Sequence, residues 1–212
     1  MSSRRYPTLL HEKRALSRGY NIIAGIDESG RGPLAGPVVA AAVILNKHKF
    51  KNKIDDCKRL TPKSRLHAYR EIIENSIYSV AVIGQNVIDH INIYNATKVA
   101  MEKAIIGLSV NPDYVLIDGT MKLSLPCKGY SIKRGDRNCL SIACASIIAK
   151  VWRDRIMERL HSLYPKYGFI NHKGYGTAMH FKMLKKYGPS PVHRLSFEPV
   201  RSLNKKFDEY IN

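Results

Sequence analysis

The chain has few acidic residues and lacks any long apolar run. Its 17 Asp and Glu residues stand against 35 Lys and Arg in 212 residues, so the formal net charge is +18. The longest apolar run, at 38–45, falls well short of the roughly 20 residues that span a membrane. Since the N-terminus also lacks the apolar core of a secretion signal, we expect a cytoplasmic protein with no membrane association.

The cysteines form no recognisable metal-binding motif. Cys57, Cys127, Cys139 and Cys144 include no C-x-x-C pair and no zinc-ligand spacing, so in a reducing compartment we expect them to remain thiols. The sequence also contains no internal repeat and no low-complexity segment. Its length suits a single domain with a substantial core.

The positive charge is unevenly distributed. Residues 1–60 carry a net charge of +7, residues 61–120 carry −1, and residues 121–212 carry +12. Basic ends around a neutral middle favour surfaces that bind a polyanion, and nucleic acid is the first candidate. A protein that binds nucleic acid without catalysis would account for this charge as well.

The most informative segment is IIAGIDESGRGP at 22–33. An apolar, strand-like run ends in two adjacent carboxylates, Asp27 and Glu28, and burying ionised carboxylates without a partner is unfavourable. Gly30 and Gly32 let another molecule approach the main chain closely, and Arg31 between them suits a phosphate. An Asp-Glu pair alone is more often a solvated turn, but beside this loop it favours a metal-dependent phosphodiesterase.

Two more carboxylates fit the same chemistry. Asp118 follows the apolar run 115–117 and precedes a glycine, as in an ordinary turn or at a functional strand end. Asp136, in KRGDR at 133–137, suits a helix cap or a position beside both metal and polyanion. Four carboxylates from separate segments suit two-metal phosphoryl transfer, and Mg²⁺ prefers oxygen ligands. Asp154, in WRDR at 152–155, is more typical of an ion pair and is kept as a further candidate.

The neighbouring carboxylates Asp27 and Glu28 pose a geometric problem. Adjacent residues of a regular strand point to opposite faces of the sheet, so the two side chains cannot share one site on a regular strand. We expect the chain to bend at Ser29-Gly30 and so bring them together.

Hydrophobic patterning predicts a mixed sheet flanked by helices. Thr61-Pro62 is a good helix start, because threonine caps helices and proline is tolerated in the first turn. Strands that first form a meander and then alternate with helices favour a mixed sheet. The expected helices span 9–18, 61–75, 97–108 and 140–163, and the expected strands span 22–26, 38–45, 76–83, 114–117 and 130–132.

The C-terminal part is rich in turns, aromatics and charge. The segment YGFINHKGYGT at 167–177 interleaves aromatic rings, which stack on bases or sugars, with cations that bind phosphates. A glycine-rich surface loop with two partly buried tyrosines explains the same pattern. His193-Arg194 opens a second basic loop, which has no clear chemistry of its own.

Together these segments resemble ribonuclease HII, the type 2 ribonuclease H family, over nearly the whole chain. The resemblance rests on GIDESGRGP at 25–33, DCKRL at 56–60, LIDG at 116–119, KRGD at 133–136, ASIIAKVWRD at 145–154 and HKGYGT at 172–177. It implies a ribonuclease H-like fold, with a mixed five-stranded sheet and a small C-terminal helical part. It further implies that residues 1–212 form one catalytic domain, in which 164–212 contact the substrate.

The resemblance also implies an activity and a site. The expected activity is a monomeric endonuclease that cuts the RNA strand of RNA–DNA hybrids, and cuts 5′ of single ribonucleotides in duplex DNA, leaving 3′-hydroxyl and 5′-phosphate ends. The expected cofactor is Mg²⁺ or Mn²⁺. The matching metal-binding and catalytic residues are Asp27, Glu28, Asp118 and Asp136, and the matching substrate contacts are Gly30, Arg31 and Gly32 for the ribose 2′-hydroxyl, Tyr175 for the RNA–DNA junction, and Lys58 and Lys173 for phosphates.

Two positions depart from the family pattern. Ser29 stands where alanine is usual, and Cys57 replaces a serine, which removes a good hydroxyl donor. The sister family ribonuclease HIII carries an additional N-terminal domain, and only about twenty residues precede the first expected strand here, so that assignment is disfavoured. A resolvase or transposase core of the same fold remains an alternative, although such proteins do not need the glycine loop together with the junction tyrosine.

Overall fold

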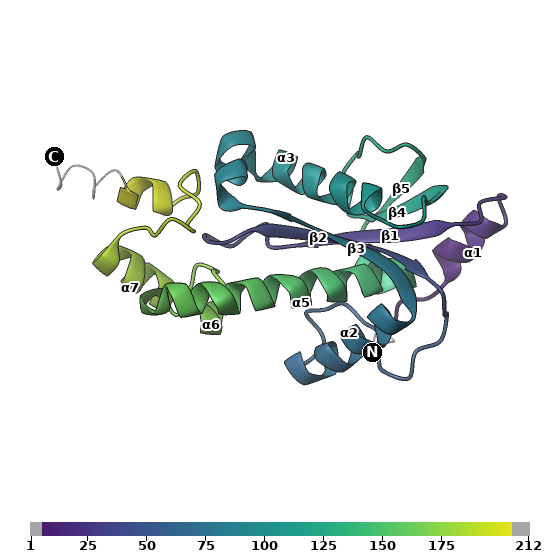
Figure 1. The fold of residues 1–212 in the computed structure, drawn as a ribbon, viewed down its shortest axis with the longest axis horizontal. Helices are drawn as coiled ribbons and strands as arrows, with labels where there is room; N and C mark the ends of the chain where they lie inside the picture. Colours follow the sequence, from purple (N-terminus) through teal and green to yellow (C-terminus); the bar gives the residue numbers. More distant parts are fainter. Residues whose placement is uncertain (1–5, 205–212) are drawn as a thin grey trace, which may run out of the picture.

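The computed structural model describes residues 6–204, which form a five-stranded sheet with helices on both faces (Figure 1). The strand order is β3-β2-β1-β4-β5. β1 pairs antiparallel with β2 and parallel with β4, so the sheet is mixed, as predicted. The strands are β1 (Ile23–Ser29), β2 (Val38–Leu45), β3 (Ser76–Ile83), β4 (Tyr114–Asp118) and β5 (Lys128–Ile132).

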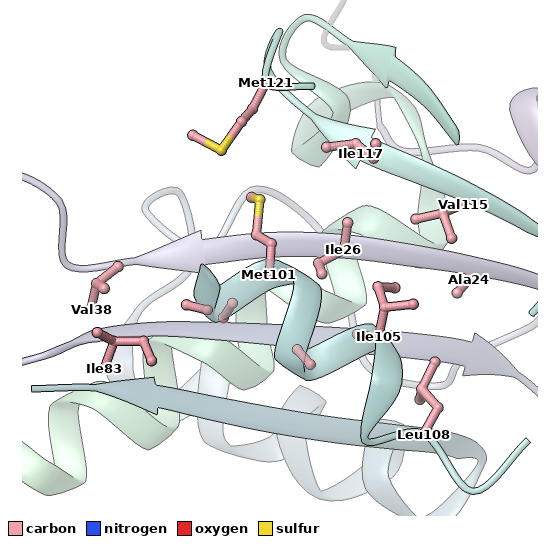
Figure 2. Close-up of a cluster of buried hydrophobic side chains, with 14 of the residues drawn as sticks. Ala24, Ile26, Val38, Ile83, Met101, Ile105, Leu108, Val115, Ile117 and Met121 are labelled. Atoms are coloured by element: carbon pink, nitrogen blue, oxygen red, sulfur yellow. The ribbon is translucent and has the colours of Figure 1, made fainter. Parts of the chain in front are cut away.

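Both faces of the sheet are covered by helices. Along β2, alternate residues belong to two different cores: Ala40 and Ala42 face the helix α3, whereas Ala41 and Val43 face α2 and α5. Figure 2 shows the first core, in which Met101 and Ile105 of α3 lie over β1, β2 and β4. The main helices are α1 (Leu10–Leu16), α2 (Pro62–Glu74), α3 (Gln85–Ile106) and α5 (Leu140–Leu163).

Most of the element boundaries agree with the sequence prediction, and α2 shows why. Thr61 caps this helix by accepting a hydrogen bond from the backbone N–H of Ser64, with Pro62 in the first turn, as predicted. The helix predicted at 97–108 is wrong at its start, because α3 begins at Gln85. Asn92 has a φ of 64° inside it, and its side chain accepts the N–H of Asn95. This break in the helix interrupts the periodicity on which the prediction relied.

The C-terminal part packs around the far end of α5 (Figure 1). Its short helices cover a third core, in which Phe169 and Leu184 pack against Met157 of α5 and Leu34 of the loop after β1. The small C-terminal helical part is thus confirmed, and it lies beside the glycine loop. The short elements of the chain are α4 (Gly135–Asn138), the 3-10 turn η1 (Pro165–Tyr167), α6 (Phe169–His172) and α7 (Ala178–Tyr187).

Within residues 6–204, no helix has the length and apolar character that crossing a membrane requires.

Candidate active site

A cavity of about 710 Å³ opens where β1 and β4 end. Segments distant in the sequence line it: β1 and its glycine loop, the loop before α2, the end of β4, the helices α2, α4 and α5, and the loop after α6. The lining residues are Asp27, Glu28, Ser29, Gly30, Arg31, Gly32, Cys57, Lys58, Arg65, Asp118, Asp136, Ser146, Lys150 and Tyr175.

Three of the predicted carboxylates converge in this cavity. One oxygen each from Asp27, Glu28 and Asp118 lies within 4.8 Å of the other two, a spacing that one divalent cation can bridge. Asp27 is buried, whereas Glu28 and Asp118 are partly exposed to the cavity. Oxygen-only ligand sets of this kind suit hard cations such as Mg²⁺ and Mn²⁺.

The expectation that a bend at Ser29-Gly30 brings Asp27 and Glu28 together is wrong, because β1 stays regular through both residues. β1 keeps its antiparallel register with β2 through both residues, up to the pair Ser29↔Val39. Glu28 and Asp118 also line a smaller cavity of about 190 Å³ on the α3 side, which Asp27 does not line. The carboxylates therefore leave opposite faces, as in a regular strand. They meet because the last residue pair between β1 and β4 is Ile26↔Ile117. Beyond that pair β4 no longer covers this edge of β1, so both side chains extend past the edge toward one another.

Asp136 is held close to this cluster by the backbone of its own turn. The N–H groups of Gly135 and Asp136 donate to one carboxylate oxygen of Asp118, at 2.6 and 3.4 Å. An added Cβ at Gly135 would lie 2.6 Å from Ile142 Cδ1 and 3.2 Å from that same oxygen, so a larger residue there would displace the Ile142 side chain. Asp136 lines the cavity but stands outside the tight group of three.

All four carboxylates have raised pKa values. Burial is the first cause for each: it raises the pKa of Asp27, which the charges of Glu28 and Asp118 raise further, and it raises the pKa of Glu28 and of Asp118. Burial and the charge of Asp118 raise the pKa of Asp136 to about 6. Like charges thus oppose ionisation of this cluster, and a bound cation would relieve that repulsion.

The glycine loop, residues 30–37, follows directly from β1 and leads into β2. Gly30 has a φ of +101°, a conformation that side-chain-bearing residues rarely adopt. A Cβ at this position would overlap the side chain of Arg153 and lie 2.7 Å from the carbonyl oxygen of Pro37. Arg31 is exposed and pairs with Glu28 at 3.4 Å. A Cβ on Gly32 would lie 3.8 Å from the ring of Tyr175, so the loop and the predicted junction tyrosine adjoin across the cavity.

Two predicted candidates lie outside this cavity. The ammonium group of Lys173 pairs with Glu158 at 3.0 Å, and Lys173 does not line the cavity, in contrast to Lys58 and Tyr175. Asp154 is an ion-pair residue, because it binds Lys150 at 2.6 Å and Arg65 at 3.5 Å.

Sequence reasoning missed three side chains that line the cavity. Arg65 of α2 and Lys150 of α5 bring positive charge to its wall, and the Ser146 side chain lowers the pKa of Asp27 in part. The i,i+4 spacing of Lys150 and Asp154 was a usable signal. No sequence pattern linked Arg65 to α5.

Cys57 lines the cavity as a neutral thiol. Burial raises its pKa to about 11, and the nearby charges of Asp27 and Asp56 act in the same direction. The thiol therefore does not ionise at neutral pH. Burial opposes the charge of the neighbouring Lys58, but the carboxylates of Asp56 and Asp27 outweigh it and raise the pKa of Lys58, so Lys58 is a cation.

A mixed five-stranded sheet with clustered carboxylates at the ends of its central strands, in a strongly basic chain, defines a nuclease of the ribonuclease H-like class. The ribonuclease HII family model matches residues 24–200. Ribonuclease HII of Caldicellulosiruptor bescii is 51% identical over 187 residues, covering 88% of this chain and 91% of that protein. The chain belongs to the ribonuclease HII family, and so it is a ribonuclease H endonuclease that acts on RNA–DNA hybrids.

Other relatives agree with this assignment. Ribonuclease HII of Chlamydia trachomatis serovar D is 51% identical over 196 residues, covering 91% of this chain and 89% of that protein. The crystal structure of ribonuclease H2 from Pyrococcus horikoshii matches with a TM-score of 0.76 at 25% identity, over 89% of this chain and all of that chain. Bst-RNase HIII in complex with Mn²⁺ shares the fold, with a TM-score of 0.70 at 16% identity, over 89% of this chain and 70% of that one.

Proposed function

We propose that this enzyme is a metal-dependent endonuclease that cuts the RNA strand of hybrids and also cuts 5′ of single ribonucleotides embedded in duplex DNA. The observation that carries the metal dependence is the group of Asp27, Glu28 and Asp118, whose oxygens lie within 4.8 Å of one another. Their raised pKa values, caused first by burial, also fit a site that gains from a bound cation.

In this proposal the four carboxylates are the catalytic residues. Asp27, Glu28 and Asp118 hold Mg²⁺ or Mn²⁺, and Asp136 completes the set from the turn before α5. When bound, the cation polarises the scissile phosphate and promotes ionisation of a water nucleophile. Cleavage that releases a 3′-hydroxyl and a 5′-phosphate requires that water to attack from the side opposite the leaving 3′ oxygen.

The rest of the cavity supports a nucleic-acid substrate. Lys58, Arg65 and Lys150 bring three cations to its wall, which suits phosphates beside the scissile one. The loop Gly30-Arg31-Gly32 is the part that reads the ribose 2′-hydroxyl, a group that donates and accepts hydrogen bonds. The C-terminal part, which the structure describes from residue 164 to residue 204, belongs to the same domain in this proposal, supplies Tyr175 to the substrate, and acts within a monomer.

One assay tests this function. Three duplexes are compared with Mg²⁺, with Mn²⁺ and with EDTA: an RNA–DNA hybrid, DNA with one ribonucleotide, and DNA alone. We expect cleavage of the first two only, and only with metal, with the single cut 5′ of the ribonucleotide. Cleavage in EDTA, or equal cleavage of all-DNA duplex, would refute the proposal.

Tyr175 offers a more specific prediction. Tyr175 is 42% exposed, and its ring faces the guanidinium of Arg153 at 5.8 Å, so the other side of the ring remains available to a sugar. Ring packing of this kind contributes roughly ten- to hundredfold in affinity. We therefore expect Tyr175→Ala to lose that much activity on a single embedded ribonucleotide, and far less on a continuous hybrid.

Tyr175→Phe is the matched control, because it keeps the ring and removes only the hydroxyl group. It retains activity if ring packing matters and loses it if the phenol hydrogen bond matters. Cleavage rates of both substrates by both variants decide the question. Equal losses on the two substrates would mean that Tyr175 is only structural.

A further inference from the structure

Two arginines are fully buried beside the glycine loop. Arg153 of α5 and Arg194 of the C-terminal part are both 0% exposed. Neither forms an ion pair with a carboxylate within residues 6–204; both donate to backbone carbonyl oxygens instead. Burial and the charge of Arg153 lower the pKa of Arg194 to about 9, which still leaves a cation at neutral pH. Such a cation is costly to bury, so its hydrogen bonds must be well made.

Arg194 holds the glycine loop at three points. Its guanidinium donates to the carbonyl oxygens of Gly30 at 2.5 Å, Arg31 at 2.8 Å and Gly36 at 3.0 Å. Its own N–H donates to the carbonyl oxygen of Leu34 at 2.8 Å. The two residues that precede Gly32 are therefore fixed by one side chain from the far end of the sequence.

His193, the residue before it, holds the loop of Tyr175. The N–H of Ser190 donates to His193 Nδ1 at 2.9 Å, so the ring proton of His193 lies on Nε2. That proton is donated to His180 Nε2 at 2.9 Å, and His180 Nδ1–H donates to the carbonyl oxygen of Tyr175 at 2.9 Å. Burial lowers the pKa of His193 to about 3 and that of His180 to about 4, so both rings are neutral.

His193 and Arg194 thus connect the two loops that, under the proposed function, contact the ribose and the sugar next to it. His193 also bridges Ala35 of the glycine loop through the backbone. These buried hydrogen bonds set the distance between Gly30-Arg31 and Tyr175. Neither His193 nor Arg194 lines the cavity itself. Arg153 strengthens the link, because it donates to the carbonyl oxygens of Ala35 and Lys173.

We propose that the His193-Arg194 pair is a positioning element for ribose recognition, which holds the glycine loop and the Tyr175 loop in register with one another. This inference rests on the proposed function. The inference gives the C-terminal part a role beyond substrate contact. The enzyme distinguishes ribose from deoxyribose only while His193 and Arg194 hold the C-terminal part against the glycine loop. A role in overall folding alone would affect every duplex equally.

The test is a ratio of affinities, measured in EDTA so that no cleavage occurs. The two ligands are a duplex with one ribonucleotide and the same duplex in DNA alone. Arg194→Lys keeps the charge but cannot reach three carbonyl groups, and lost charge-assisted hydrogen bonds correspond to roughly tenfold or more. We expect the preference for the ribonucleotide to fall by about that factor, with the affinity for all-DNA duplex unchanged.

Two further variants complete the experiment. Arg201→Lys is the control, because Arg201 is exposed and its ion pair within residues 6–204 is with the surface residue Glu198; this variant should keep the wild-type ratio. If Arg194→Lys does not fold, His193→Leu carries the test, because it removes the ring hydrogen bonds to Ser190 and His180. His193→Gln, which keeps a terminal donor for His180, should restore part of the ratio.

The outcomes separate the two claims. A wild-type ratio of one would overturn the proposed recognition of single ribonucleotides, and this inference with it. If the wild type prefers the ribonucleotide duplex and both Arg194→Lys and His193→Leu keep that preference, the positioning role is overturned while the proposed function stands. Equal loss of affinity for both duplexes would also overturn it, because that result indicates damage to the fold.

Discussion

Asp118→Asn should abolish cleavage of every substrate while leaving the fold intact. A divalent cation contributes several kcal/mol to the transition state of phosphoryl transfer, so loss of one ligand corresponds to roughly 10³-fold or more in rate. The fold should survive, because the asparagine carbonyl can still accept the N–H groups of Gly135 and Asp136 that Asp118 accepts. Turnover with saturating Mg²⁺, together with circular dichroism, measures both effects.

The same variant makes a second prediction about stability. Because burial and neighbouring charges raise the pKa values of Asp27, Glu28 and Asp118, removing one negative charge should relieve repulsion in the metal-free protein. The melting temperature in EDTA should therefore rise, whereas the stabilisation by added Mg²⁺ should shrink. Glu74→Gln, at an exposed position on α2, is the control and should change neither quantity. Near-normal turnover by Asp118→Asn would remove it from the metal site.

Much of the fold could be predicted because its strands and helices follow simple periodicity. β2 and β3 coincide with the predicted ranges, since each is a short run with several Val and Ile residues between turn-forming residues. α3 could not be predicted in full, because the φ of 64° at Asn92 interrupts its helical geometry and so breaks the periodicity between its first turns and the rest of the helix. The one-turn helix α6 could not be predicted because packing against α5 holds it. α7 did carry a usable signal, the Thr177 side chain that caps its first turn.

The candidate site divides in the same way. Asp27, Glu28 and Asp118 could be predicted because each follows an apolar strand, and strands that lie side by side bring their ends together. The way in which the Asp27 and Glu28 side chains meet could not be predicted, because it depends on where the pairing of β1 with β4 stops. The carbonyl groups that Arg194 binds belong to the backbone, which every residue has, so no residue type in the sequence marks them as its partners.

Gly30→Ala should produce the second large effect. Left-handed backbone costs a residue with a side chain about 1–2 kcal/mol, and Gly30 has a φ of +101°. The new Cβ would also overlap Arg153 and lie 2.7 Å from the carbonyl oxygen of Pro37, so the loop must shift. A shift of about 1 Å in a positioning group costs roughly 100-fold in rate. We expect that loss on embedded ribonucleotides, accompanied by a lower melting temperature.

Gly32→Ala separates strain from recognition. Its Cβ would lie 3.8 Å from the ring of Tyr175, an ordinary contact distance, so the free protein should fold and melt like the wild type. With substrate bound, however, that methyl group would occupy space that the ribose needs if the main chain approaches it closely. The expected result is weaker cleavage of a single ribonucleotide at an unchanged melting temperature, measured beside Gly30→Ala on the same duplex. Wild-type cleavage by Gly32→Ala would show that the ribose does not approach the loop there, and would confine the effect of Gly30→Ala to strain.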